Sequence, residues 1–189
     1  DLKGVSLDLL NTVNPLEVEG IADGRFALSS LLGEATLTGS LHVEGLAIND
    51  FPIGEVDLSA TMEERNLRLH LENYFNEQKK IAIDGTIDLD AQNLDFAANL
   101  TQANLVIFEP FLSKYISNLG GTLTGNLQLQ GNLDRPELIG STRVAQGKMR
   151  INYLNTDYQL DGSLLFRPTQ MSFQDLVLRD LNGNRATFT

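Results

Sequence analysis

The feature that most constrains the fold is a strict alternation of apolar and polar residues across residues 120–144. Every second position from Leu123 to Leu133 holds leucine or glycine, and threonine, asparagine or glutamine stand between them. This two-residue period is that of a β-strand with one dry face and one wet face. Pro136 then marks a turn or the first residue of a strand, because proline cannot donate to a strand ladder, and a second strand is predicted at 138–144.

The same alternation recurs along nearly the whole chain, which predicts about a dozen short strands and an all-β protein. The hydrophobic fraction of 42% is high enough to bury a substantial surface, which favours a folded chain over a disordered one. Two dipeptides, Asp23-Gly24 and Asn182-Gly183, are typical of two-residue hairpin turns. A change of parity between Phe173 and Leu176 predicts a bulge or tight turn at Gln174-Asp175.

One segment departs from this design. Between Phe108 and Leu119 the apolar residues recur at the three- and four-residue spacing of a helix. We therefore predict a single short α-helix near 109–119. The predicted organisation is one elongated β unit with a first β segment at 1–104, the short helix at 105–119 and a second β segment at 120–189.

A weak internal repeat favours an elongated array over a closed barrel. Residues 36–47 and 122–133 share six of twelve positions at an offset of 86. The alternation leaves two arrangements open. The apolar face is either closed by a second sheet or left as a groove that takes acyl chains. The pattern alone favours the sandwich or solenoid core.

The charge balance excludes several partners. The formal net charge is −11 and lysine and arginine are not clustered, so nucleic acid and anionic membrane surfaces, which both need a basic patch, are poor candidates for partners. Cysteine is absent, which is compatible with the periplasm. The longest uninterrupted apolar run, Leu105 to Phe108, is too short to span a bilayer. We expect the chain to be a piece of a longer protein.

Residues with catalytic or metal-binding chemistry are few. His42 and His70 lie on the polar parity of their strands, which favours solvated histidines over bases or ligands. The aspartates between Asp84 and Asp95 alternate with apolar residues and so fan outward, unlike a calcium loop, and Asp180–Asn184 is more typical of a hairpin turn. No Ser-His-Asp set or Cys/His metal spacing can be assembled. We expect no enzyme activity, no cofactor and no metal.

Five short segments, in their order and spacing, resemble the C-terminal domain of TamB-type proteins, which belong with the AsmA-like proteins of Gram-negative envelopes. The likeness is best from about Leu105 to Thr189. The segments are Leu105–Leu112, Gly121–Gly131, Asp134–Gly140, Ile151–Thr156 and Leu178–Ala186.

The resemblance implies a β-taco, an elongated, curled antiparallel sheet that forms an open half-pipe with an apolar interior. It also implies a non-enzymatic translocation and assembly module that is anchored to the inner membrane outside this chain and crosses the periplasm. Such a protein moves phospholipid between the inner and outer membranes. It also supports outer-membrane biogenesis and protein secretion with an assembly barrel of the TamA type.

In that arrangement the residues on the apolar parity line a groove for phospholipid acyl chains. Two other functions remain open. The chain is then either a chaperone-like module that pairs its sheet edge with nascent outer-membrane barrel strands, or a plain β-solenoid spacer. Open edges also allow self-association. The predicted lining residues are Leu37, Leu41, Val43, Val56, Leu58, Leu67, Leu69, Ile81, Ile83, Ile87, Leu89, Phe96, Leu123, Leu127, Leu129, Leu138, Val144, Met149, Ile151, Tyr153, Leu160, Leu164, Phe166 and Phe173.

Overall fold

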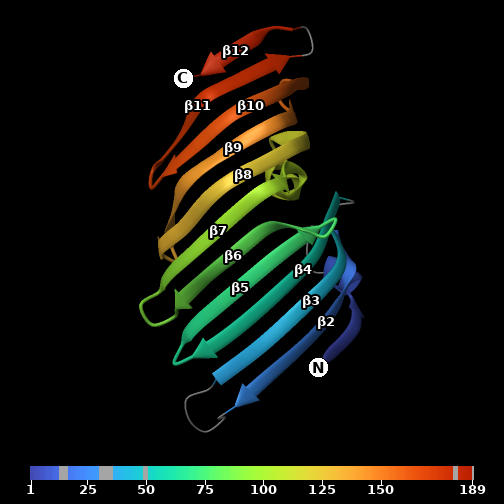
Figure 1. The fold of residues 1–189 in the computed structure, drawn as a ribbon, viewed down its shortest axis with the longest axis vertical. Coiled ribbons are helices and arrows are strands. Elements are labelled where there is room, and N and C mark those ends of the chain that lie inside the picture. Colours follow the sequence, from blue (N-terminus) through green and yellow to red (C-terminus); the bar gives the residue numbers. More distant parts are fainter. Residues whose placement is uncertain (13–16, 30–35, 49–50, 181–182, 189) are drawn as a thin grey trace. The chain divides into compact units, whose positions relative to one another are not determined.

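The computed structural model describes residues 1–12, 17–29, 36–48, 51–180 and 183–188. Twelve strands form one sheet in which the order in space equals the order in the chain (Figure 1). The helical segments are the 3₁₀ turns η1 (Leu7–Thr12) and η2 (Leu105–Phe108) and the single α-turn α1 (Glu109–Leu112). The strands are β1 (Leu2–Ser6), β2 (Val18–Ser29), β3 (Thr36–Ile48), β4 (Phe51–Glu63), β5 (Asn66–Phe75), β6 (Gln78–Asp88), β7 (Asn93–Asn104), β8 (Ile116–Asn132), β9 (Arg135–Ile151), β10 (Thr156–Arg167), β11 (Gln170–Asp180) and β12 (Arg185–Phe188).

The sheet is antiparallel and open, with β1 and β12 at its edges. This confirms the predicted all-β fold and the prediction that the sheet does not close into a barrel. The closed sandwich that the alternation favoured is not formed, because all twelve strands of the described residues belong to the same sheet.

The chain divides into two compact units. The first contains Asp1–Ala98 and Gln128–Glu137, and the second contains Asn99–Leu127 and Leu138–Thr189. Strands β7, β8 and β9 each contribute residues to both units.

Tight turns join the strands of the first unit. Glu64 and Arg65 connect β4 to β5, and Asn76 and Glu77 connect β5 to β6, all four with positive φ angles between 46° and 62°. A two-residue turn with both residues left-handed matches the natural twist of a hairpin. The turn predicted at Asp23-Gly24 is wrong, because β2 continues through it and both residues pair with β3.

Bulges interrupt the regular pairing at several points. In β9, Gln146 has a φ of 52° and its backbone N–H donates to the Asp161 carboxylate of β10 at 2.9 Å. In β7, Gln102 has a φ of 50°, and its backbone N–H donates to the Thr124 hydroxyl of β8 at 3.1 Å. The bulge predicted at Gln174-Asp175 is confirmed by a register shift between β10 and β11. Each bulge bends its strand and increases the local twist, so the sheet curls.

Glycine permits an unusually close approach between β8 and β9. Gly125 and Gly140 have φ angles of 154° and 133°. A Cβ at Gly125 would lie 2.2 Å from the carbonyl oxygen of Ser141, and one at Gly140 would lie 2.2 Å from that of Asn126. No side chain fits at either position, because real Cβ atoms do not approach an oxygen so closely.

The helix predicted at 109–119 is reduced to one turn. α1 ends at Leu112, and β8 begins at Ile116. Asn118 has a left-handed φ of 56° inside β8. A bulge residue adds one position to a strand, so Ile116 and Leu119 share a face at a three-residue spacing that a helix also shows. Within the described ranges, no helix combines the length and apolarity that a membrane span requires.

Candidate functional site

One face of the sheet in the first unit carries four rows of mainly apolar side chains that cross β2 to β6. A row consists of directly opposed residues on successive strands, which lie about 4.8 Å apart. We call these rows the apolar face of the first unit. The most uniform row joins Leu41, Leu58, Leu71 and Ile83. The others are Leu28–Leu37–Met62–Leu67–Ile87, Phe26–Gly39–Ala60–Leu69–Gly85 and Ala22–Val43–Val56–Asn73–Ile81.

Most side chains of this face are only half-buried. Leu41, Leu58, Leu71 and Ile83 all fall between the buried and the exposed classes. Side chains in a fully covered core touch neighbours on all sides. The intermediate burial therefore indicates that these leucines contact one another along the rows and keep one side accessible.

Two phenylalanines lie over glycines in the rows. A Cβ at Gly39 would lie 2.5 Å from the Phe26 ring, and a Cβ at Gly85 would lie 2.2 Å from the Phe96 ring. Each ring fills the space that the glycine leaves, which is how aromatic residues support glycine in sheets. Phe26 still remains 52% exposed, so this end of the face presents aromatic surface.

Burial varies across the apolar face of the second unit. Leu123, Val144 and Leu176 are 6%, 2% and 5% exposed, whereas Phe173 and Met171 are 39% and 53% exposed. Part of this face is therefore covered by neighbouring side chains, and part of it stays accessible, as in the first unit. The rows between β9 and β11 are Thr142–Leu164–Phe173, Gly140–Phe166–Met171 and Gly147–Leu160–Leu178.

All but two of the predicted lining residues lie in strands. Leu89 is half-buried in the turn after β6. Tyr153 lies in the turn between β9 and β10 and is 95% exposed, so it does not line either face. Val43, Leu123 and Val144 are buried and Phe173 is 39% exposed. The half-buried strand residues are Leu37, Leu41, Val56, Leu58, Leu67, Leu69, Ile81, Ile83, Ile87, Phe96, Leu127, Leu129, Leu138, Met149, Ile151, Leu160, Leu164 and Phe166.

Two polar residues on the apolar faces were missed in the sequence. The Asn73 amide donates to the carbonyl oxygens of Ile53 and Glu55 at 2.9 and 3.1 Å, so it supports the start of β4. The Thr142 hydroxyl is buried without a hydrogen-bond partner. Both residues occupy positions where the alternation predicts an apolar residue. A polar residue at such a position is the sequence signal that identifies them.

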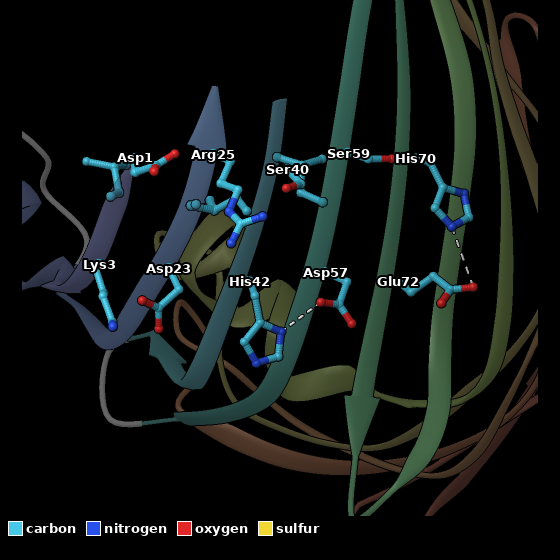
Figure 2. A pocket seen from close by; sticks show the side chains of 14 residues that line it. Asp1, Lys3, Asp23, Arg25, Ser40, His42, Asp57, Ser59, His70 and Glu72 are labelled. Carbon is cyan, nitrogen blue, oxygen red and sulfur yellow. Dashed lines mark hydrogen bonds and ion pairs between the residues drawn. The ribbon is translucent and has the colours of Figure 1, made fainter. Parts of the chain in front are cut away.

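The opposite, polar face of the first unit is hollowed, with a volume of about 710 Å³ (Figure 2). The labelled side chains of β2 to β5 include Arg25, His42, Asp57, His70 and Glu72. Most of the charged groups that line the hollow are carboxylates, so its potential favours cations over anions.

Each histidine is held by a carboxylate of the next strand. His42 Nδ1 lies 2.7 Å from Asp57 Oδ1, and His70 Nδ1 lies 2.6 Å from Asp84 Oδ1. Both pairs are directly opposed across the sheet. The Asp57 hydrogen bond is the main cause that raises the pKa of His42, the charges of Asp57, Glu44 and Glu55 add to it, and partial burial opposes it.

This arrangement is a repeated one. Glu44 and Glu72 lie two residues after the histidines, with carboxylates 3.7 and 3.6 Å from the respective Nε2 atoms. The sequence signal is the repeated Leu-His-x-Glu at 41–44 and 69–72. Among the described residues no three His, Cys, Asp or Glu side chains converge as a metal site would require. The two histidines thus form cross-strand pairs with Asp57 and Asp84 on the polar face.

Comparison with known proteins places the chain in a family. The family model described as TamB, N-terminal domain, matches residues 3–144. Protein TIC236, chloroplastic, of Arabidopsis thaliana is 26% identical over 180 residues, which cover 90% of this chain and 8% of that protein. No solved structure matches the chain.

The matching domain differs from the one that the sequence resemblance indicated. The resemblance was to the C-terminal domain and was best after Leu105, whereas the match is to the N-terminal domain and extends from 3 to 144. The comparisons give no support to the C-terminal or AsmA-like assignment. Because the family model covers more than half of the residues, the chain belongs to the TamB family.

Proposed function

We propose that this chain is a segment of a periplasmic protein whose apolar face shields phospholipid acyl chains during movement between the inner and outer membranes. The observation that carries the proposal is the continuity of the apolar rows. The row Leu41–Leu58–Leu71–Ile83 crosses four strands without a polar residue. Four strands span about 15 Å, which suits an extended hydrocarbon chain rather than a compact ligand.

The energetics favour binding that is strong but nearly independent of position. Burial of hydrocarbon contributes about 0.8 kcal/mol per methylene, so a sixteen-carbon tail gains at most roughly 12 kcal/mol. The neighbouring rows are also mainly apolar, although they include Gly39, Gly85 and Asn73. A chain that moves from one row to the next therefore keeps mostly apolar contacts.

Membership in the TamB family supports the cellular setting of the proposal. In that setting the full-length protein is anchored to the inner membrane outside this chain and works with an outer-membrane assembly barrel of the TamA type. It has no catalytic role.

A matched pair of variants tests the proposal. Leu58 lies on the apolar face, and Ser59 lies next to it on the polar face. Leu58→Asp places a charge among the acyl chains, whereas Ser59→Asp places the same charge in water. We expect lipid extracted from the purified wild-type chain and from Ser59→Asp, measured by mass spectrometry, and little from Leu58→Asp.

Transfer itself is tested in the second unit. Leu127→Asp is expected to block passage of fluorescent phospholipid in the full-length protein, and Asn126→Asp is expected to leave it unchanged, because the neighbouring, exposed residue points to the other face. Circular dichroism establishes that the variants keep their strands. Equal lipid content and equal transfer in all variants would refute the groove.

The open edges favour one other candidate function. β1 and β12 end the sheet, and an edge strand can pair with a strand of another chain. A chaperone-like module that holds nascent outer-membrane strands would use these edges and not the apolar face. Cysteine crosslinks from β1 or β12 to a barrel client, in a fixed strand register, would favour it.

A further inference from the structure

Two loops of the second unit meet and expose apolar side chains. One follows α1 and the other joins β9 to β10 (Figure 1). Leu112 and Tyr115 of the first loop are 37% and 63% exposed, and Tyr153 and Leu154 of the second are 95% and 51% exposed. We call these four residues and Lys114 the tyrosine tip.

Hydrogen bonds of Asn152 hold the two loops together. Its backbone N–H donates to the Tyr115 carbonyl at 3.0 Å, and its side-chain amide donates to the Ser113 carbonyl at 2.8 Å. Its amide oxygen accepts from the Ser117 hydroxyl at 2.6 Å. Leu154 N–H adds a turn bond to the Ile151 carbonyl at 3.1 Å. The exposed side chains are therefore presented by an ordered scaffold, so their exposure is built into the fold.

The local charge differs from that of the whole chain. Lys114 is the one side chain in 112–117 and 152–155 that is charged at neutral pH, and its Nζ lies 5.4 Å from the Tyr115 ring centre. The nearest carboxylates in the sequence are engaged elsewhere. Glu109 accepts the Asn118 and Leu119 N–H groups, and Asp157 is paired with Arg150. The tyrosine tip itself contains no carboxylate, so it forms a locally cationic patch in a chain of net charge −11.

The chemistry of the patch fits a membrane interface. Tyrosine combines an apolar ring with a polar hydroxyl and is enriched where bilayers meet water. Leucine enters the acyl region, and a neighbouring lysine reaches the phosphates. Four such side chains offer on the order of 500 Å², which is below the roughly 800 Å² per partner of a stable protein interface. The area thus favours shallow insertion into lipid over a protein partner.

We propose that the tyrosine tip is a membrane-contact site that inserts into the headgroup region of a phospholipid bilayer. The inference rests on the proposed function, since a groove that exchanges phospholipid must meet a bilayer. It assigns to Tyr153 a role outside the groove. It also makes the tip a local exception to the repulsion between the acidic chain and anionic lipid.

The absence of tryptophan from the chain allows a direct test. Tyr153→Trp places a single fluorophore in the tip, and Leu133→Trp places one in the exposed turn between β8 and β9 as a control. With vesicles of phosphatidylethanolamine and phosphatidylglycerol, we expect a blue shift and quenching by brominated acyl chains in Tyr153→Trp and neither in Leu133→Trp.

Affinity measurements complete the test. Tyr153→Ser combined with Leu154→Ser should lower vesicle affinity by about tenfold or more, whereas Leu133→Ser should not change it. Lys114→Gln should lower affinity for anionic vesicles by about fivefold and leave that for neutral ones unchanged. The inference is overturned if vesicles leave the emission of Tyr153→Trp unchanged. It is also overturned if the emission shifts with protein concentration alone, because that shift indicates a contact between copies of the chain.

The outcome is separable from that of the proposed function. Suppose that lipid is extracted from the wild-type chain but vesicles do not change the emission of Tyr153→Trp. This result overturns the membrane contact alone. The groove alone is overturned if Tyr153→Trp inserts into vesicles while the chain carries no lipid and its Leu58→Asp variant behaves as wild type.

Discussion

The close approach of β8 and β9 makes Gly140 a position where a single added methyl group should be strongly destabilising. In Gly140→Ala the new Cβ lies 2.2 Å from the Asn126 carbonyl oxygen and 3.0 Å from the Leu127 Cα. The φ of 133° is also a region that only glycine adopts readily. Backbone strain of this kind costs about 1–3 kcal/mol, and overpacking costs about a further 1–3 kcal/mol. We therefore expect a loss of roughly 4 kcal/mol, which is a large part of the 5–15 kcal/mol that stabilises a typical domain.

Two other glycines separate the contributions. Gly45 has a φ of 62° and open space around its Cβ position, so Gly45→Ala carries strain without a clash. We expect it to cost about 1–2 kcal/mol. Gly120 has neither strain nor clash, with Lys148 Cβ at 4.0 Å as the nearest atom. Gly120→Ala should be neutral or stabilise by about 0.5 kcal/mol through the unfolded state.

Urea unfolding followed by circular dichroism measures the series. With a slope of about 2 kcal/mol per molar urea, Gly140→Ala should lower the midpoint by about 2 M. A midpoint for Gly140→Ala equal to that of Gly45→Ala would show that β8 and β9 can move apart to accept the methyl group without further loss of stability. A midpoint equal to that of Gly120→Ala would refute the close approach altogether.

Single side chains give three further expectations. Thr142→Val removes the buried, unpartnered hydroxyl and should raise the free energy of unfolding by about 1 kcal/mol, whereas Thr142→Ser should lower it. A valine variant that is less stable than the wild type would mean that the hydroxyl has a partner. Glu77→Gly relieves a left-handed residue in the β5–β6 turn and should stabilise by about 0.5 kcal/mol, with Gln78→Gly in the strand as a destabilising control. The raised pKa of His42 means that its pairing with Asp57 stabilises the fold fully below about pH 6.5 and less as the pH rises through the folded pKa. The urea midpoint should therefore fall less between pH 6 and pH 8.5 in His42→Gln than in the wild type, and equal slopes would contradict the pairing.

The strands and their faces could be predicted because a two-residue period assigns every side chain to one face once a strand is recognised. Leu41, Leu58 and Ile83 share a face, as the alternation implied. The prediction that Tyr153 lines the groove was wrong because Ile151 is the last residue of β9. Tyr153 lies in the following turn, where the two-residue period no longer assigns a side chain to a face.

Other errors came from contacts that a single strand does not encode. Asp23-Gly24 has the composition of a turn, but continuous pairing with β3 keeps it extended. Part of the helical spacing before Leu119 reflects the short turns η2 and α1, and the three-residue step from Ile116 to Leu119 includes the left-handed residue Asn118 inside β8. The His42–Asp57 pair depends on the β3–β4 register, which the local pattern leaves open. Short strand-and-turn motifs recur in every part of such a sheet, so they indicated the family but misplaced the domain.

The identity of spatial order and chain order makes the length of this architecture adjustable. Each strand bonds to the strands just before and after it in the chain. Two consecutive strands can therefore be duplicated or deleted without reversing the direction of the rest or rearranging distant contacts. A sheet built in this way can be lengthened in steps of about 10 Å per hairpin.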